Sequence, residues 1–463
     1  LIGNSGKGKE YAYRSYFGRV MYSYADRYLF QANIRHDGSS RFAKKHRWGT
    51  FPSFSAGWVL SEENFMKNLN WDWLSFLKIR ATWGALGNER IGDFPYMSTI
   101  AFGNTIFYQN NGIYFDQTAS QQKYAIENVT WEKTESTDIG LDISFLNNRL
   151  RVNGDYYWKN TKDMLLAMAI PDFLGFSDPD VNAGKMSTKG YELNVSWNDH
   201  IGDFSYGIAI NFSDFTSKMG DLQGTQFLGD KVKMEGSEFN EWYGYVSDGL
   251  FLTEEDLKNS PKINDKNTQL GDIKYKDISG PDGVPDGKIS PEYDRVLLGS
   301  SLPHFLYGGN INLGYKNFDL SLAFQGVGKQ NARLAREMVE PFRNNYGNFP
   351  AIIDGNYWSP YNTDEQNAVA KYPRLTHVNK SSNYAMSDYW LFNGGYFRLK
   401  NITLGYTFPK EWMNAIGIKG ARIYASASDL FCLSKYPKGW DPEMGVSEYP
   451  ITTSILLGVS VNF

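Results

Sequence analysis

A stretch of acidic residues separated by glycine and proline, at positions 277–289, is the part of the chain that comes closest to a metal-binding motif. Asp282 and Asp286 match the first and fifth positions of an EF-hand calcium loop, whose ligands are carboxylate and carbonyl oxygens. The match is incomplete, because Val284 stands at the third position and Tyr293 replaces the bidentate glutamate. The same residue types are also typical of a loop folded by Asx turns and Gly/Pro chemistry. Asp282 and Asp286 are therefore candidate calcium ligands, with a plain acidic loop as the alternative.

Aromatic residues gather in two stretches in the second half of the chain. Exposed aromatic rings can stack on sugar rings, and tyrosine adds a hydroxyl group that forms hydrogen bonds. On that ground the candidate substrate-binding residues are Trp242, Tyr243, Tyr245, Tyr346, Phe349, Tyr357, Trp358 and Tyr361. The commoner use of such rings is to hold loops together or to contact a partner protein.

Polar and charged side chains recur at every second position of several segments whose other positions are apolar. We expect this polar side to face a hydrated channel, and its charged candidates are Arg19, Arg35, Arg80, Arg151 and Asp155. Further members of the same side are Gln31, Asn33, Lys78, Asn153, Asn194 and Asn211. For any single charge, the simpler role is an ion pair between neighbouring strands.

Signatures of catalysis are missing from the sequence. The five histidines, at positions 36, 46, 200, 304 and 377, show no metal-ligand spacing, and no G-x-S-x-G, H-E-x-x-H or P-loop motif is present. Sequence alone leaves paired carboxylates for glycosidase chemistry open, but Glu254, Glu255 and Asp256 are typical of a solvated helix start. We therefore expect no enzymatic activity and no cofactor apart from the candidate calcium ion.

Charge and hydropathy narrow the class of protein. The chain has 463 residues, with 47 Lys and Arg against 51 Asp and Glu, so its formal net charge is −4 and a nucleic-acid partner is not expected. The single cysteine, Cys432, excludes a disulfide framework and a cysteine-rich zinc site. Mean hydropathy is −0.47, and no apolar run approaches the roughly 18 residues of a membrane helix. Membrane β-barrels remain open, because their strands are apolar only at alternate positions.

Alternation of apolar and polar residues dominates the chain. In the last segment Ile455, Leu457, Val459 and Val461 share one side of an extended strand, and small polar residues share the other. The segment that contains Arg398 breaks this parity, which predicts either a β-bulge or a part that rises above a membrane. We predict about thirteen strands, near residues 11–24, 28–36, 48–60, 76–86, 131–146, 149–160, 186–198, 203–215, 301–315, 318–328, 389–408, 420–432 and 451–463.

The connections between these strands alternate between two kinds. One kind is mostly tight, and two of its longer members, 61–75 and 409–419, are expected to contain short helical turns. The other kind comprises four long connections, near 87–130, 161–185, 216–300 and 329–388, and two shorter ones, 37–47 and 433–450. This alternation is typical of outer-membrane barrels, which have short periplasmic turns and long extracellular loops.

Three features favour a membrane barrel over a soluble β-sandwich: the unequal connections, aromatic residues such as Trp158 and Trp197 near strand ends, and an aromatic C-terminal residue, Phe463. An open sheet edge is not tolerated in hydrocarbon, so the first and last strands need partners. Because bacterial barrels have even strand numbers, we expect further strands and a plug before Leu1, in a barrel of about 22 strands.

Several stretches resemble the SusC/RagA-like family of TonB-dependent outer-membrane transporters of Bacteroidetes. In family order they are Arg14–Val20, Arg35–Phe42, Trp48–Trp58, Leu77–Gly84, Trp131–Thr134, Lys189–Leu193 and Tyr396–Tyr406. The resemblance implies that residues 1–463 are the C-terminal part of one 22-stranded receptor barrel in the bacterial outer membrane, preceded by a plug with a TonB-binding segment. It further implies uptake of oligosaccharides or, in some members, peptides.

The partners that the resemblance implies are a SusD-like surface lipoprotein that acts as a lid, TonB, the lipid bilayer with lipopolysaccharide, and a second transporter–lipoprotein pair in a dimer. Our leading hypothesis is an importer of oligomeric nutrients, with a glycan as the favoured substrate and a peptide as the alternative. A second hypothesis is a surface or adhesive barrel without transport. A third is a soluble carbohydrate-active β-protein, in which residues such as Leu141 and Ile210 would pack against a second sheet.

Overall fold

The computed structural model describes residues 8, 10–109, 112–121, 124–168, 170–222, 224, 226–343, 347–445 and 448–463. Tyr346 lies outside the described residues. The chain forms two compact units, which we describe separately. The first unit comprises residues 1–193, 215–225 and 234–236, and the second comprises residues 194–214, 226–233 and 237–463.

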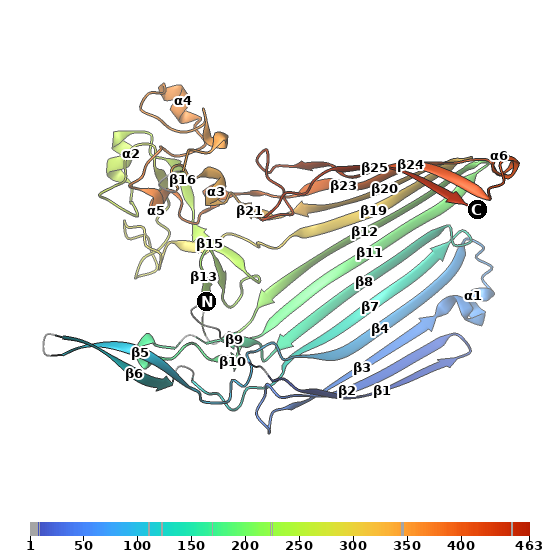
Figure 1. Cartoon of the computed structure of the whole chain (residues 1–463), viewed down its shortest axis with the longest axis horizontal. Helices are drawn as coiled ribbons and strands as arrows, with labels where there is room; N and C mark the ends of the chain where they lie inside the picture. Colours follow the sequence, from blue (N-terminus) through green and yellow to red (C-terminus); the bar gives the residue numbers. More distant parts are fainter. Residues whose placement is uncertain are drawn as a thin grey trace. The chain divides into compact units, whose positions relative to one another are not determined.

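Thirteen strands form one antiparallel sheet whose neighbours follow each other along the chain, apart from small inserted strands (Figure 1). In sheet order they are β1 (Tyr13–Tyr24), β2 (Tyr28–Ser39), β3 (Trp48–Val59), β4 (Leu74–Asn88), β7 (Glu132–Phe145), β8 (Leu150–Lys162), β11 (Met186–Ile201), β12 (Phe204–Met219), β19 (His304–Tyr315), β20 (Phe318–Lys329), β23 (Tyr396–Thr407), β24 (Gly420–Ser434) and β25 (Ser454–Asn462). Each predicted strand overlaps one of them, so the all-β antiparallel prediction is confirmed.

The two faces of the sheet differ in polarity, as the alternation predicts. In the second unit Ile208, Ile311, Leu322 and Ile402 lie opposite one another across β12, β19, β20 and β23, so one face carries continuous rows of apolar side chains. These rows stay accessible: Ile208 is 37% and Ile210 45% exposed, and in the first unit Leu141 is 39% exposed. Covering such a side chain with apolar material stabilises by about 1.5–3 kcal/mol. The side chains therefore do not pack against a second sheet as the soluble alternative requires.

Tight turns join the strands at one end of each hairpin. Ala25 and Asp26 between β1 and β2, and Asn147 and Asn148 between β7 and β8, all have positive φ, as type I′ hairpin turns require. The connection from β3 to β4 contains the short helices η1 (Leu60–Glu62) and α1 (Asn64–Lys67), and that from β23 to β24 contains α6 (Lys410–Ala415). The predicted helical turns are confirmed in both connections.

Two β-bulges explain the broken parity around Arg398. In the pairing of β20 with β23, Ala323 faces Asn401 and Phe324 faces Leu399, so Lys400 is the extra residue. In the pairing of β23 with β24 the extra residue lies on β24, where Asp429 has a φ of 50°. The predicted bulge is confirmed, and it places Arg398 on the same face as Asn401.

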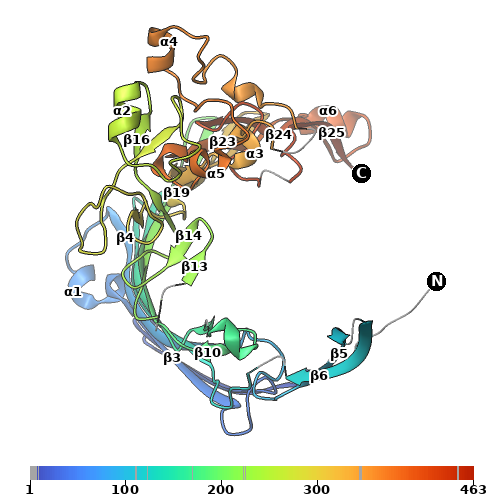
Figure 2. The ribbon, with the colours of Figure 1, turned by 90° about the vertical axis from the view of Figure 1, so that its left-hand side faces the viewer.

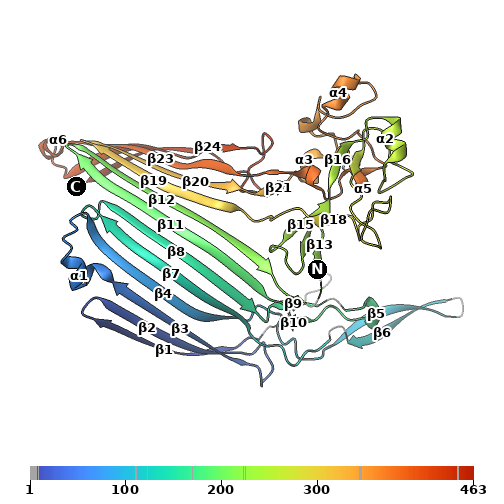
Figure 3. The same ribbon diagram turned by 180° about the vertical axis from the view of Figure 1, so that it is seen from behind.

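The longest connections have structure of their own. Residues 89–131 contain a hairpin of β5 (Ile100–Gln109) and β6 (Gly112–Gln121), which extends away from the strands of the first unit (Figure 3). The other small elements are β9 (Leu165–Ala167), η2 (Asp172–Leu174), β10 (Asp180–Asn182), β13 (Gln226–Leu228), β14 (Lys231–Lys233), β15 (Glu241–Tyr245), β16 (Ser247–Leu250), α2 (Glu254–Asn259), β17 (Ile273–Tyr275), β18 (Arg295–Leu297), β21 (Asn331–Arg333), α3 (Arg336–Val339), η3 (Ala351–Ile353), α4 (Asp364–Ala368), α5 (Lys380–Asn383), η4 (Asp388–Trp390) and β22 (Leu391–Asn393). Within the described residues, no helix is long and apolar enough to cross a membrane.

Candidate functional site

A group of charged residues spans three neighbouring strands of the first unit. The guanidinium of Arg80 on β4 lies 2.6 Å from a carboxylate oxygen of Asp155 on β8, and 3.5 and 3.4 Å from those of Asp138 and Asp142 on β7. Lys78 adds a contact of 3.4 Å to Asp142. Arg80 and Asp155 therefore share one face, as their parity predicts, and they form the cross-strand ion pair that was the simpler alternative.

The other predicted channel residues are more isolated. Arg19 donates a hydrogen bond of 2.7 Å to the Asn33 side chain across the β1–β2 pair. Arg35 lies 3.1 Å from Asp37 on its own strand, and the Arg151 side chain is exposed. That these residues line a hydrated channel stays a prediction.

A second charged cluster lies in the second unit, where the 435–453 connection meets β23. The buried guanidinium of Arg398 donates hydrogen bonds of 2.6 Å to both carboxylate oxygens of Asp441, and its Nε lies 2.6 Å from Glu443. Asp429, the bulge residue of β24, lies 3.6 Å from Arg398 and 2.7 Å from Lys400. The cluster therefore ties a long connection to the polar face of the sheet.

A fully buried carboxylate joins two long segments of the second unit, 237–303 and 330–395, which Figure 2 shows folded together around α2 and α5. The Asp272 side chain accepts hydrogen bonds from Arg374 at 2.7 Å, Asn379 at 2.8 Å and Asn383 at 2.9 Å. Next to it the ring of Trp358 covers Gly271, where a Cβ atom would lie 2.2 Å from the indole. These contacts hold together the two segments that carry the candidate aromatic residues.

The candidate aromatic residues separate into packed and accessible ones. Tyr245 is 7% exposed, belongs to the hydrophobic core of the loops and packs on Tyr275, with 5.3 Å between ring centroids. Burial raises the pKa of the Tyr245 hydroxyl. Tyr245 therefore has the loop-packing role that was the alternative, and substrate binding by its ring stays an untested prediction. Phe349 and Trp358 pack partly against the same core, as the alternative predicts.

Three further candidate rings differ in how far they are exposed. Tyr361 is 96% exposed, whereas Tyr357 is half-buried with its ring edge against Phe349. Tyr243 is also half-buried and lies beneath the guanidinium of Arg295, 4.9 Å from the ring centroid. Tyr361 is therefore the open ring of the set, and Tyr357 and Tyr243 have neighbours that restrict access.

Trp242 lines a cavity of the second unit. The cavity measures about 650 Å³, a volume that suits one or two sugar units or one or two residues of a peptide chain. Its wall includes Asp230, Lys231, Trp242, Ser301, Gln330, Asn331, Arg333, Arg336, Glu337 and Tyr436. The indole Nε1 of Trp242 donates a hydrogen bond of 2.6 Å to the Asn331 carbonyl, which fixes the ring.

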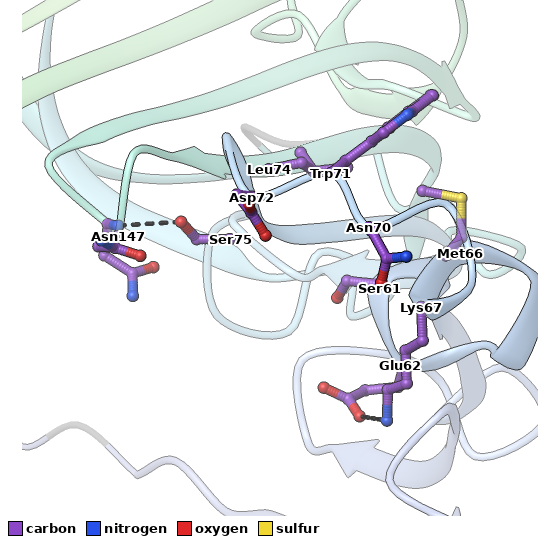
Figure 4. A pocket seen from close by; sticks show the side chains of 11 residues that line it. Ser61, Glu62, Met66, Lys67, Asn70, Trp71, Asp72, Leu74, Ser75 and Asn147 are labelled. Atoms are coloured by element: carbon purple, nitrogen blue, oxygen red, sulfur yellow. Dashed lines mark hydrogen bonds and ion pairs between the residues drawn. The ribbon is translucent and has the colours of Figure 1, made fainter.

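A separate cavity of about 740 Å³ lies in the first unit. That second cavity lies at the turn end of the strands, between the β3–β4 connection and the β7–β8 turn. Figure 4 shows Trp71 at its wall and the Lys67 ammonium beside Glu62, 2.6 Å apart. Because it lies at the end with the short turns, it is not built from the long connections that would capture a ligand.

The Trp242 cavity owes its charge to three cations and two carboxylates. Arg333 forms an ion pair with Asp230, Arg336 lies 2.7 Å from the buried Glu340, and Glu337 pairs with Arg343. Lys231 stands directly opposite Trp242 in the β14–β15 pair, and its Nζ lies 4.5 Å from the centroid of the indole ring. Burial lowers the pKa of Lys231. The sequence analysis missed this cavity, because no periodic pattern marks the short β14 strand.

The acidic loop is folded by hydrogen bonds to its own backbone. Asp286 accepts a hydrogen bond of 3.0 Å from the Lys288 amide, and Asp277 accepts one of 2.6 Å from the Gly287 amide. Asp282 is exposed, and Asp294 is fully buried with three backbone amides as donors. Among the described residues, no three His, Cys, Asp or Glu side chains are grouped so as to hold a metal ion. Calcium binding by Asp282 and Asp286 stays a prediction.

Comparisons with known proteins agree on one family. The family model described as TonB dependent receptor-like, beta-barrel matches residues 2–430. TonB-dependent receptor SusC of Bacteroides thetaiotaomicron is 32% identical over 468 residues, covering 97% of this chain and 43% of that protein. TonB-dependent receptor P3 of Formosa agariphila is 31% identical over 453 residues, covering 93% of this chain and 42% of that protein.

The fold also matches a solved structure. The RagAB peptide transporter has a TM-score of 0.78 and 23% sequence identity, with 98% of this chain and 47% of that chain covered. At this identity the likeness concerns the fold alone. The chain spans less than half the length of each of these relatives.

Proposed function

Because the chain belongs to the TonB-dependent receptor-like β-barrel family, whose members are outer-membrane transporters and receptors, we propose that the full-length protein imports oligomeric nutrients across the outer membrane. The observation that carries this proposal is the sheet itself. One face exposes rows of apolar side chains such as Leu141 and Ile210, which suit lipid, and the opposite face carries charged clusters around Arg80 and Arg398. Energy would come from TonB through a plug domain.

An oligosaccharide is the favoured substrate of the proposed transporter. The accessible rings of Trp242 and Tyr361 support it, because aromatic faces stack on sugar rings. The relative of known structure is named as a peptide transporter, so a peptide is the second candidate.

A SusD-like lipoprotein is the proposed lid, and the β5–β6 hairpin supports such a partner. Phe102 is 81% and Phe115 75% exposed, and Ile106 and Tyr108 are also exposed along the same hairpin. An accessible apolar surface of this kind is typical of a protein-binding site.

Uptake by intact cells tests the proposal. A strain that carries the full-length protein should accumulate a fluorescently labelled oligosaccharide, and deletion of either the transporter gene or the TonB gene should abolish accumulation. A labelled peptide of similar mass, measured in parallel, separates the two substrate classes. Binding at the cell surface without TonB-dependent accumulation would contradict import and favour the adhesive alternative.

A further inference from the structure

We propose that the Trp242 cavity binds an acidic group on an oligosaccharide, with Lys231 as the cation that pairs with it and Trp242 as the ring beside the sugar. This inference rests on the proposed import function and narrows its substrate class to anionic glycans. A carboxylate of a uronic acid and a sulfate ester offer the same chemistry to the site.

The ion pairs of the cavity wall leave Lys231 available to an anionic ligand. Arg333 and Arg336 each have a carboxylate partner, and so does Lys274 elsewhere in these loops. Lys231 differs, because no carboxylate in the described part of the chain lies within ion-pair distance of its Nζ. A partly buried ammonium that faces an aromatic ring keeps most of its capacity for a charge-assisted hydrogen bond.

The remaining wall of the cavity suits a sugar. Ser301, Gln330 and Asn331 offer hydroxyl and amide groups, which match the hydroxyl groups of a pyranose. Asn331 and Trp242 are held together by the indole hydrogen bond, so the ring is fixed before a ligand arrives. A fixed ring beside a free cation favours an acidic sugar over a neutral one, because only the acidic sugar uses both groups.

The chain supplies a matched control on the same strand. Lys233 lies two residues from Lys231 on the same face of β14, and its Nζ lies 4.9 Å from the ring centroid of Phe239. Burial lowers the pKa of Lys233 as it does that of Lys231, but Lys233 is not part of the cavity wall. Lys231→Gln and Lys233→Gln therefore remove the same charge from similar surroundings, and only the first removes it from the cavity.

Binding to the purified full-length transporter with its lid tests the inference. Isothermal titration calorimetry compares a short oligogalacturonate, a sulfated galacto-oligosaccharide and a neutral malto-oligosaccharide of the same length. We expect an acidic probe to bind roughly 10- to 100-fold more tightly than the neutral one, the range expected for one charge-assisted hydrogen bond. Lys231→Gln should remove this preference, whereas Lys231→Arg and Lys233→Gln should keep it.

Equal binding of acidic and neutral probes, no binding of any probe, or an unchanged preference in Lys231→Gln would each overturn the inference. A preference for an acidic peptide that depends on Lys231 would overturn its saccharide part. Because binding is measured without TonB, it is independent of import. If the acidic probe binds but cells do not take it up, only the proposed import function is contradicted. If cells take up the acidic probe equally well with the wild type and with Lys231→Gln, only this inference is contradicted.

Discussion

Replacing Arg398 by methionine should release the 435–453 connection from the wall of the sheet. Arg398 is 2% exposed, and its guanidinium faces Asp441, Glu443 and Asp429 at 2.6, 2.6 and 3.6 Å. Methionine keeps an unbranched side chain but removes the charge, so three carboxylates would face Lys400 alone.

The magnitude follows from the burial of the cluster. Removing one partner of a buried ion pair costs about 3–5 kcal/mol. The carboxylate side chains of Asp441 and Glu443 are 16% and 20% exposed, so water screens part of the loss, and we expect about 3 kcal/mol. This corresponds to roughly a hundredfold change in the equilibrium between the docked and the released connection.

Hydrogen exchange on the full-length protein in lipid vesicles measures this equilibrium directly. Amides of residues 435–445 should lose protection in Arg398→Met, while those of β23 change less. Arg19→Met is the control, because Arg19 is exposed and donates a hydrogen bond to the uncharged side chain of Asn33. Equal exchange in the Arg398→Met and wild-type proteins would refute the reasoning.

Three further outcomes are expected. Binding of an acidic oligosaccharide should weaken as the pH rises through the pKa of Lys231, which burial lowers, so calorimetry should show the loss at a lower pH than for an ordinary lysine. Gly271→Ala should destabilise the loops by about 1–3 kcal/mol, measured by limited proteolysis, because the new Cβ would meet the Trp358 ring and φ is +82°. Leu141→Arg should cost about 2–4 kcal/mol of folding free energy in lipid vesicles, because an apolar face would carry a charge.

Each of these outcomes has a matched comparison. Lys233→Gln should leave the pH dependence of binding unchanged. Gly283→Ala also has a positive φ, of 76°, but its Cβ would meet open space, so it should cost less than Gly271→Ala. Leu141→Arg should be harmless if Leu141 faces water, and equal folding of the variant and the wild type would contradict a lipid-facing position.

Periodicity predicted the sheet because the physics of a strand is local. Every second side chain of a strand shares one environment. A few consecutive positions, such as those around Ile208 and Ile210, are therefore enough to predict which side chains lie on the apolar face. The bulge near Arg398 was also visible in the sequence, because an extra residue reverses the alternation of apolar and polar positions that follows it.

The sites were harder to predict because their partners are distant in sequence. Arg398 meets Asp441 across 43 residues, and Trp242 meets Asn331 across 89. No local pattern distinguishes Tyr245, which is buried, from Trp242, which lines a cavity three residues away. The lysines on either side of Val232 belong to a strand of three residues, which is too short for a periodic pattern to mark it.

The buried Asp272 has a consequence for how such proteins diversify. Its partners Arg374 and Asn379 lie 102 and 107 residues further along the chain, in the other large connection. If only one of the two connections were exchanged between relatives, either the buried carboxylate or its hydrogen-bond donors would lose their partners. The two segments are therefore expected to be inherited together, as one unit that relatives exchange whole.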